Sequence, residues 1–518
     1  MNRKFPYLPF FLCLISSFFL SYIIYFLLDE ILFPLDSDFY FHLSVAEEYS
    51  RLGFVSKIPW SIESIWIDGF GDTHFFYHQI LRFFSLSSWK LFIAFGFFIN
   101  LFSLAWIYFL LNLNSINNQS NTRQRNSINV TSLKINTKNF IINMILIQFI
   151  FLFGSIPFTG RLLLGKGLLI FLPILFWYWY FLIVSSKKVV FLLTWIAVWT
   201  YPLAPLLLVL SFVKFIDILI NQRDEIRIFI PIFYMTFLGF IMGLVIHPSF
   251  PFQWKAYKME WWNQLLSNPE LERISEWNPP GSELFFNTYI YIMMILVLYF
   301  YSHRSELKTF FNENLSLLFL MACGIFLSWG NTKAIEWSLP IFILFLMNSL
   351  AYHQNFFLAN WKQPFGITLG ILFLLFQIQT LSQSIQLHSK LYAKKNLHLT
   401  ALQVCNQQFN NVKKIWIRWD DFPEFSYYCR NKEYPFGLNP LYAYTKNSDR
   451  YKMIRRFWID SKVEQNRILE YLNYEIVVLN QKRESDFVLR NFQSSPKWLL
   501  LYSNENYLLF QNSASIQK

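Results

Sequence analysis

From Leu8 to Leu43 the chain reads LPFFLCLISSFFLSYIIYFLLDEILFPLDSDFYFHL. The first part is a predominantly apolar run, and an α-helix of about 20 such residues crosses a hydrocarbon core of about 30 Å. Two acids, Asp36 and Asp38, follow shortly after this run, and an aromatic stretch and His42 come next. The stretch therefore predicts a membrane-spanning helix that is followed by acids at the membrane surface.

The composition extends this prediction to the whole chain. Of its 518 residues, 54% are hydrophobic, 21% are aromatic and only 15% are charged, unlike a soluble domain. Apolar runs recur between polar loops, so we expect an α-helical polytopic membrane protein with about eleven spanning helices. The expected spans lie near residues 8–29, 88–111, 140–157, 168–184, 189–200, 203–220, 228–246, 285–301, 315–329, 335–350 and 366–383.

The net charge of +12 bears on membrane orientation and on membrane lipids as partners. The runs 189–200 and 203–220 are short and form either two helices or one broken helix. Two helices place the basic loops on the amino-terminal side, as the positive-inside rule requires. We therefore expect a multi-pass bacterial inner-membrane protein with a cytoplasmic amino terminus and a periplasmic carboxyl terminus. No basic stripe interleaved with aromatic residues is present, so nucleic acid is not an expected partner.

This orientation divides the chain into a transmembrane domain, residues 1–383, and an external soluble domain, residues 384–518, called the tail below. In the tail, KKIWIRW and YEIVVLN favour strands, SDRYKMIRRFW and VEQNRILEYL favour helices, and KWLLLYSNENYLLFQN favours two strands around a turn. We therefore expect an α/β fold there. Cys405 and Cys429 lie in the tail, and the sequence leaves open whether they form a disulfide.

Two long external loops accompany the tail. In the first loop, residues 30–87, SDFYFHLSVAEEYSRLG and GDTHFFYHQILRFFSL have apolar residues at helical spacing, so each predicts an amphipathic helix lying in the membrane interface. The second loop, residues 247–284, is rich in tryptophan and proline, which favours a structured interfacial or re-entrant segment.

Asp36 and Asp38 are the first candidates for chemistry. One interpretation is that Asp36 or Ser37 caps the helix that starts at Asp38, where a second acid favours the positive helix end. The other is that the two carboxylates bind a divalent cation or remove a proton from a hydroxyl. Capping accounts well for one acid but less well for two.

Three histidines extend this candidate site. His42 lies four residues after Asp38, so a helix would place both on one face, where His42 would orient the acid or bind substrate. His74 and His78 have the same spacing and are either polar anchors or substrate ligands. Zinc is a weaker hypothesis for this pair, because the sequence lacks a third ligand and a glutamate at metalloprotease spacing.

Further polar residues occur in the other external segments. Arg161 and Lys166, in PFTGRLLLGKGLL, are suited to a lipid phosphate, with snorkelling to headgroups as the alternative. Lys333 and Glu336 lie three residues apart at a helix start, where a helical salt bridge is the simplest explanation and substrate contact the other.

In the second loop, His247 is a candidate substrate ligand. Glu276, in SEWNPP, is held by prolines that would direct its carboxylate towards the first loop.

Taken together, DSDFYFHLSVAEEY after the first helix, a long first loop, about ten more helices and an external tail resemble the GT-C superfamily of polytopic glycosyltransferases. This superfamily includes oligosaccharyltransferases, protein mannosyltransferases and aminoarabinose transferases. The quoted segment looks like the D-x-x-Y/F-H first-loop segment of the oligosaccharyltransferases. Residues 1 to about 380 carry the architectural resemblance.

The resemblance implies a transferase that takes a sugar from a polyprenyl-phosphate-linked donor and passes it to an envelope glycan, lipid or protein acceptor at the external face. Asp36 or Asp38 would be the catalytic base, and Arg161 and Lys166 would stabilise the leaving phosphate. A pyrophosphate donor would imply Mg or Mn, held by Asp36, Asp38 and Glu276. The tail has no clear WWD-type signature, which argues against protein N-glycosylation.

Three other functions compete with this interpretation. One is an O-antigen-type ligase or polymerase, and another is an envelope scaffold whose tail binds a partner. The third is a transporter or flippase of lipid-linked intermediates, which would place charged residues in broken helices at the membrane midplane. The apolar runs hold very few ionisable residues, so chemistry at the outer surface fits better.

Overall fold

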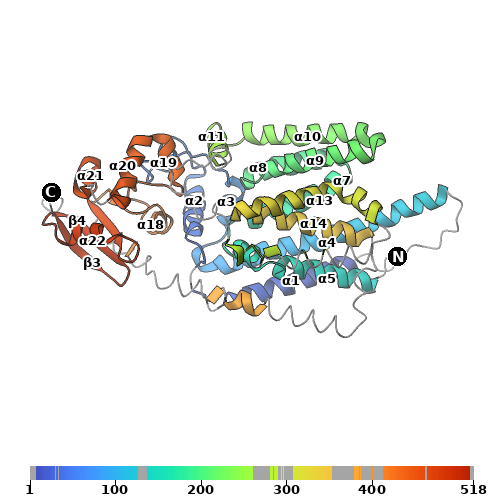
Figure 1. Cartoon of the computed structure of the whole chain (residues 1–518), viewed down its shortest axis with the longest axis horizontal. Helices are drawn as coiled ribbons and strands as arrows, with labels where there is room; N and C mark the ends of the chain where they lie inside the picture. Colours follow the sequence, from blue (N-terminus) through green and yellow to red (C-terminus); the bar gives the residue numbers. More distant parts are fainter. Residues whose placement is uncertain are drawn as a thin grey trace. The chain divides into compact units, whose positions relative to one another are not determined.

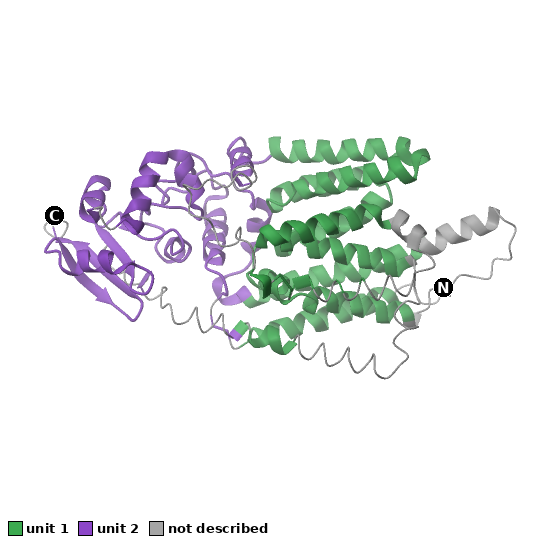
Figure 2. Ribbon diagram, in the orientation of Figure 1, with its two compact units in different colours: residues 1–30, 90–246, 275–385 green, residues 31–89, 247–274, 386–518 purple. Residues whose placement is uncertain are grey.

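A computed structural model of the chain shows two compact units (Figure 2). Unit 1 comprises residues 1–30, 90–246 and 275–385, and unit 2 comprises residues 31–89, 247–274 and 386–518. The structure describes residues 8–29, 31–32, 34–125, 137–260, 281–283, 285–286, 288–289, 293, 296, 307–352, 378–383, 385–386, 400–401, 412–460 and 464–513.

The elements described in unit 1 are helices (Figure 1). Large apolar side chains such as Phe18, Phe26 and Tyr234 are exposed on them, as on helices that face lipid. The helices are α1 (Leu8–Leu27), α4 (Trp89–Arg125), α5 (Thr137–Phe153), α6 (Ile156–Leu163), α7 (Leu168–Ile183), α8 (Lys187–Thr200), α9 (Pro205–Asn221), η3 (Arg223–Glu225), α10 (Ile226–Val245), α13 (Leu307–Gly330), η6 (Thr332–Ala334) and α14 (Ile335–Tyr352).

The predicted number of spanning helices is not confirmed. Within the described residues, four helical segments are long and apolar enough to cross a membrane. A fifth is added if α5 and α6, which are bent by 75° at their junction, count as one span. Several predicted spans, such as 168–184, coincide with helices that are shorter than a full crossing, and most of spans 285–301 and 366–383 lies outside the described residues.

Packing on α10 shows that α8 and α9 are two helices that run in opposite directions. Gly239 of α10 lies against Thr194 of α8, and Gly243 lies against Val198, so α8 and α10 run in the same direction. A Cβ atom at Gly239 would lie 2.6 Å from the carbonyl oxygen of Phe191, so glycine permits this close approach. Phenylalanine pairs between α9 and α10 have the opposite order, so α9 runs against α10. This confirms the interpretation as two helices.

Unit 2 combines short helices with one sheet. Its strands have the order β1-β2-β4-β3, with β1 parallel to β2 and the other pairs antiparallel. The elements are α2 (Asp38–Leu52), η1 (Ile65–Ile67), α3 (Phe75–Leu81), η2 (Leu86–Ser88), α11 (Phe252–Lys258), β1 (Ile415–Trp416), α18 (Phe422–Tyr428), α19 (Pro440–Lys446), α20 (Ser448–Ile459), α21 (Gln465–Leu472), β2 (Ile476–Asn480), α22 (Asp486–Gln493), β3 (Trp498–Ser503) and β4 (Tyr507–Asn512).

The α/β prediction for the tail is confirmed for its described residues. SDRYKMIRRFW and VEQNRILEYL form α20 and α21, while YEIVVLN forms β2, and the last two predicted strands form β3 and β4. All five residues of β2 are buried, as expected for a strand that is covered on both faces. Cys429 is disulfide-bonded, and Cys405 lies outside the described residues.

A hydrophobic core joins the tail to both loops. The first loop contributes Tyr49 and Trp66, the second loop contributes Met259, and the tail contributes Phe422 and Tyr434, together with further buried residues of each segment. Burial of apolar area stabilises by about 25 cal/mol per Å². The three segments therefore form one folded unit, in which the tail, from residue 386, is grouped with both loops that were expected to belong to the transmembrane domain.

Polar contacts fix the register between the first loop and the tail. The backbone N–H of Ile62 donates to the carbonyl oxygen of Tyr434 at 3.0 Å, and the N–H of Tyr434 donates to Trp60 at 2.7 Å. Arg430 forms ion pairs with Glu47 and Glu48 of α2. These contacts place α2 against α18 and thereby position the residues that α2 carries.

The expectation that the first-loop helices lie in the membrane interface is wrong for α2. Every residue of α2 from Phe39 to Ala46 is buried, because α3 and α18 pack against the helix within unit 2. An interfacial helix would keep its polar face in water. The polar side chains of α2 are instead used inside the fold.

The second loop packs closely on the first loop. A Cβ atom at Gly71 would lie 2.3 Å from the carbonyl oxygen of Phe252, and a Cβ atom at Gly69 would lie 2.3 Å from the ring of Phe252. Only glycine permits such an approach of two backbones. Gly71 directly precedes Asp72, so this contact also fixes the backbone at Asp72.

His247 is buried where the second loop begins. Its Nδ1 accepts the backbone N–H of Ser249 at 3.0 Å, and its ring makes an edge contact with Phe75. Burial lowers the pKa of His247 from 6.5 to about 4, although the nearby Asp72 carboxylate acts in the opposite direction. His247 is therefore neutral at physiological pH, as its role as a hydrogen-bond acceptor requires.

This burial predicts a pH-dependent stability. The unfolded chain binds the proton near pH 6.5 and the folded chain only near pH 4, so stability is lost as pH falls through this window. We expect the wild type to lose roughly 2 kcal/mol through this group between pH 7 and 5. His247→Asn keeps an acceptor for Ser249 but does not titrate, so its melting temperature should fall several degrees less over the same range.

The pH dependence of wild-type stability alone does not isolate His247, because a second group changes the stability over the same pH range. Burial raises the pKa of Glu484 to about 7, which favours the folded state at lower pH. Both proteins carry Glu484, so the difference between their melting curves isolates His247. Equal falls in the two proteins would contradict a buried neutral His247.

Candidate functional site

The candidate site in unit 2 is built on α2, α3 and the turn before α3. α2 starts at Asp38 and carries His42 and, two turns later, Tyr49, while α3 carries His78. Asp72 lies in the turn, and its Oδ1 accepts the backbone N–H of His74, the residue before α3, at 2.9 Å. The second oxygen of Asp72 binds other partners.

A chain of hydrogen bonds leads from Asp72 to α2. Oδ2 of Asp72 lies 2.9 Å from Nδ1 of His78, and Nε2 of His78 lies 2.9 Å from Nδ1 of His42. Tyr49 donates its hydroxyl to Oδ2 of Asp72 at 2.8 Å. Asp72 and His78 are each 1% exposed. We call Asp72, His78 and His42 the buried relay.

The order of bonds in the relay determines where its protons lie. An ionised Asp72 accepts the Nδ1–H of His78, so Nε2 of a neutral His78 carries no proton. That nitrogen then accepts the Nδ1–H of His42, and Nε2 of His42 is left as a proton acceptor. The buried carboxylate can stabilise an imidazolium formed anywhere along the relay, as in acid–histidine catalytic pairs.

The electrostatics keep Asp72 ionised. Burial alone would raise the pKa of Asp72, but electrostatic attraction to His78 and His74 and hydrogen bonds from His78 and Tyr49 outweigh burial and hold the pKa below its usual value. Burial, and then the neighbouring Asp72 carboxylate, raise the pKa of Tyr49 far above its usual value. Tyr49 therefore remains a hydrogen-bond donor to a carboxylate.

Asp36 and Asp38 lie at the start of α2 and are both half-buried. Oδ1 of Asp36 accepts the backbone N–H of Asp38 at 3.2 Å, whereas Ser37, the residue before the helix, makes no capping bond with its side chain. Asp36 therefore performs at least the capping function. Asp38 and His42 are one helical turn apart on the same face of α2.

The predicted histidines of the first loop are brought together, but not as polar anchors. His42 and His78 are buried, and the ring of His74 lies 4.9 Å from that of His42. The nitrogens of His42 and His78 contact each other directly. Among the described residues, no group of three or more histidine, cysteine or acidic side chains is arranged to hold a metal ion. Glu276, the third candidate metal ligand, lies outside the described residues.

A second polar cluster lies in unit 1. Nε of Arg161 on α6 donates to Oε1 of Glu336 at 2.9 Å, and Tyr201 donates its hydroxyl to Oε2 of Glu336 at 2.9 Å. Glu336 is 1% exposed. A buried carboxylate requires such partners because its desolvation is costly. Arg161, predicted as a phosphate ligand, is thus held in place by Glu336.

Glu336 has partners beyond the one expected from spacing alone. A helical salt bridge to Lys333 stays a prediction, while the two carboxylate oxygens of Glu336 bind residues from distant segments, Arg161 and Tyr201. Lys333 lies in η6, before α14 begins, so the two residues do not share one regular helix. Lys166 is half-buried in the turn between α6 and α7, next to Gly165, which has a positive φ of 69°.

Three residues of these clusters were missed as site candidates, namely Asp72, Tyr49 and Tyr201. The sequence did contain one local signal, since Asp72 lies two residues before His74 and six before His78. Tyr49 and Tyr201 have no comparable signal, because their partners are distant in sequence.

Comparison with known proteins identifies the fold. No known family model matches the chain, and no curated protein is similar in sequence. The crystal structure of the Archaeoglobus fulgidus oligosaccharyltransferase, tethered to an acceptor peptide containing the NVT sequon, is similar with a TM-score of 0.63 and 11% identity, over 98% of this chain and 74% of that chain.

A second solved structure is also similar. ArnT from Cupriavidus metallidurans, bound to undecaprenyl phosphate, has a TM-score of 0.50 and 11% identity, over 97% of this chain and 98% of that chain. Identities this low show the fold alone. Together with the long apolar helices, these similarities show that the chain is a multi-pass membrane protein with the fold of the GT-C glycosyltransferases, as the first-loop segment indicated.

Proposed function

We propose that this protein is a membrane glycosyltransferase that moves a sugar from a polyprenyl-phosphate-linked donor to an envelope glycan, lipid or protein acceptor at the external face. The observation that carries the proposal is the buried relay, which ends on His42, one turn from Asp38 on the same face of α2. A carboxylate next to a histidine that can store a proton suits the activation of an acceptor hydroxyl.

In this mechanism an oxygen of the acceptor attacks the anomeric carbon of the donor sugar. A new C–O bond forms while the bond between the sugar and the lipid phosphate breaks, and the phosphate leaves with the bonding electrons. Asp38 takes the proton of the acceptor hydroxyl and can pass it to Nε2 of His42. Asp72 then stabilises the imidazolium through His78, which returns Asp38 to its ionised form.

Other residues have supporting roles in the proposal. Asp36 caps α2 and so holds Asp38 at the helix start. In unit 1, Arg161, fixed by Glu336, and Lys166 are the cations that we assign to a lipid phosphate. His74 and His247 support the walls of the site rather than react. Lys333 is proposed only as a further substrate contact.

A metal ion belongs to the proposal only for a pyrophosphate donor. Asp36, Asp38 and Glu276 would then hold Mg or Mn, which would neutralise charge on the leaving group. The two aspartates supply hard oxygen ligands suited to either ion. We propose a lipid monophosphate donor, for which the relay and cationic side chains suffice.

The first test separates the roles of the two acids. Asp38→Asn should lower transfer at least about 100-fold, since it removes the base. Asp36→Asn should stay within about threefold of wild type, because asparagine caps a helix as well as aspartate. The measurement is the envelope glycan profile together with the lipid-linked sugars extracted from cells that express each variant.

The control for this test is membrane insertion, followed by the amount of each protein in the membrane. If both variants insert normally and leave every glycan and lipid-linked sugar unchanged, the glycosyltransferase proposal fails. Accumulation of the lipid-linked sugar only on the cytoplasmic face would indicate a flippase instead.

A second test concerns the relay. Lipid-linked sugar accumulated in Asp38→Asn cells can serve as donor for purified protein, with release of polyprenyl phosphate as the readout. Asp72→Asn should lower the rate at least about 100-fold and shift the acid limb of the pH profile to lower pH, because the imidazolium loses its counter-charge. Tyr49→Phe, which keeps the carboxylate, should lose less than about tenfold.

The two variants act at the same place, since Asp72→Asn replaces the buried carboxylate and Tyr49→Phe removes a hydroxyl that donates to it. A purely structural role would lower both rates alike and leave the pH profile unmoved. That result would remove the relay from the mechanism.

The same assay tests the metal question. With a lipid monophosphate donor we expect full activity in the presence of a chelator, because cationic side chains offset the charge of the leaving phosphate. Added Mg or Mn should then change the rate little. Loss of activity in chelator, restored by either ion, would instead assign a metal role to Asp36 and Asp38.

A further inference from the structure

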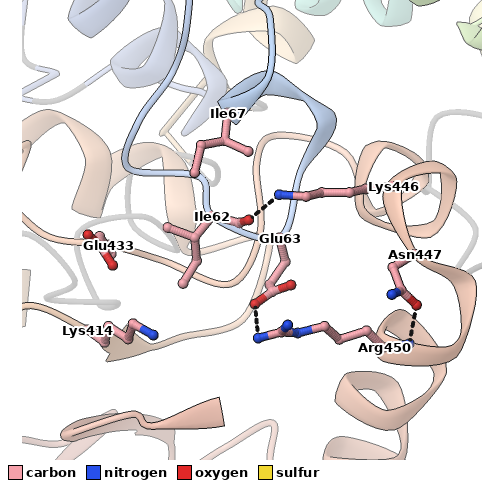
Figure 3. Close-up of a pocket in the computed structure, with 8 residues that line it drawn as sticks. All are labelled: Ile62, Glu63, Ile67, Lys414, Glu433, Lys446, Asn447 and Arg450. Atoms are coloured by element: carbon pink, nitrogen blue, oxygen red, sulfur yellow. Dashed lines mark hydrogen bonds and ion pairs between the residues drawn. The ribbon is translucent and has the colours of Figure 1, made fainter.

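Unit 2 contains a pocket apart from the relay. Its volume is about 400 Å³, within the range of roughly 300 to 1,000 Å³ that is typical of small-molecule sites. The first loop forms one wall and the tail forms the other (Figure 3). The lining residues are Ile62, Glu63, Ile67, Lys414, Glu433, Lys446, Asn447 and Arg450.

Both acids of the pocket are already neutralised by bases. Arg450 binds Glu63 at 2.8 Å, and Lys413, which is not part of the lining, binds Glu433 at 2.9 Å. Glu63 is largely buried, with 8% of its side chain exposed, so it needs this partner. The pocket thus holds three cations and two paired acids, a balance that favours an anionic ligand.

Two of the cations retain hydrogen-bonding capacity. The ammonium of Lys414 has only long contacts among the described residues, 3.5 Å to the carbonyl oxygen of Leu472 and 6.0 Å to the ring centre of Tyr474. Nε of Arg450 is buried and has no hydrogen-bond acceptor within the described part of the chain. In Figure 3 the side chains of Lys414 and Arg450 point towards each other across the pocket.

Lys446, the third cation of the pocket, connects its two walls. Its ammonium donates to the carbonyl oxygen of Ile62 at 2.6 Å, which ties α19 to the first loop. Burial lowers the pKa of Lys446, and the neighbouring acids Asp68 and Glu63 oppose this effect. This contact joins the tail to the first loop beside the pocket. The pocket is therefore already formed without a ligand.

We propose that this pocket binds an acidic sugar, meaning a sugar unit with a carboxylate or a phosphate group. The anionic group lies between Lys414 and Arg450, where charge-assisted hydrogen bonds are strongest. The sugar hydroxyls donate to the carboxylates of Glu63 and Glu433, while Ile62 and Ile67 contact the apolar face of the ring. A bare anion would use only the cations of the pocket, whereas an acidic sugar also uses the acids and the apolar side chains.

The role of this ligand follows from the proposed function and depends on it. The pocket would recognise a charged unit of the acceptor glycan while transfer occurs elsewhere on the protein. Binding itself does not depend on transfer, so it can be measured without donor or turnover. Failure of the glycosyltransferase proposal would leave the binding result intact. Equally, failure to bind an acidic sugar would leave the glycosyltransferase proposal intact.

The test uses the full chain in lipid nanodiscs with four probes, which are glucuronic acid, glucose 6-phosphate, glucose and inorganic phosphate. Binding of the three sugars is followed by saturation-transfer NMR. Inorganic phosphate has no carbon-bound protons, so its binding is measured by competition with glucose 6-phosphate. We expect both acidic sugars to bind at least about tenfold more tightly than glucose or inorganic phosphate. Lys414→Met should weaken the acidic sugars about tenfold, as expected for the loss of a charged hydrogen bond, and should leave glucose almost unchanged.

Two further variants control for folding and for general charge. Lys414→Arg keeps the charge and should bind within about threefold of wild type. Lys497→Met removes an exposed lysine of the same unit, paired with Glu470 outside the pocket, and should bind as wild type does.

Three results would overturn the proposal. The first is equal binding of glucose and the acidic sugars. The second is equal binding of inorganic phosphate and glucose 6-phosphate, which would indicate a plain anion site. The third is an equal effect of Lys414→Met and Lys497→Met.

Discussion

The arrangement of unit 2 depends on one apolar core that no single segment can complete. Trp66 of the first loop stacks on Phe41 of α2 and lies 4.6 Å from the ring of Tyr442 in the tail. Removal of these rings from water is the main favourable term available to such short elements, since α2 and α3 are too short to be stable alone. The loops therefore fold because the tail covers them, although long stretches of sequence separate the three segments.

This core also explains how a carboxylate can be buried at the candidate site. Desolvation of Asp72 is costly unless hydrogen bonds compensate for it, and Tyr49 and His78 provide these bonds. Tyr49 is itself a member of the core, so the packing that stabilises unit 2 also sets the geometry of the relay. Chemistry and stability are thus coupled at this position, and a loss of function there has to be separated from a loss of fold.

Local sequence patterns predicted much of the fold. Periodicity located α2, α20, α21 and β2, and the acids after the first apolar run indicated the superfamily fold. The pattern misled for α2, because alternation of polar and apolar residues does not reveal whether the polar face meets water or a buried partner. The contacts of Tyr201 and Arg161 with Glu336 could not be predicted either, since these residues are far apart in the sequence and only the tertiary structure brings them together.

The first loop connects the two sites that we propose in unit 2. Glu63 lines the sugar pocket and Asp72 anchors the relay, and the segment between them includes Trp66 and Gly71. Trp66 is held by the core, while Gly71 is held by the backbone of Phe252, so the segment is fixed at two points between the two sites. Packed interiors transmit small shifts instead of absorbing them. Glu63 and Asp72 therefore lie on one packed segment, and we propose this segment as the route by which acceptor recognition acts on the reacting groups.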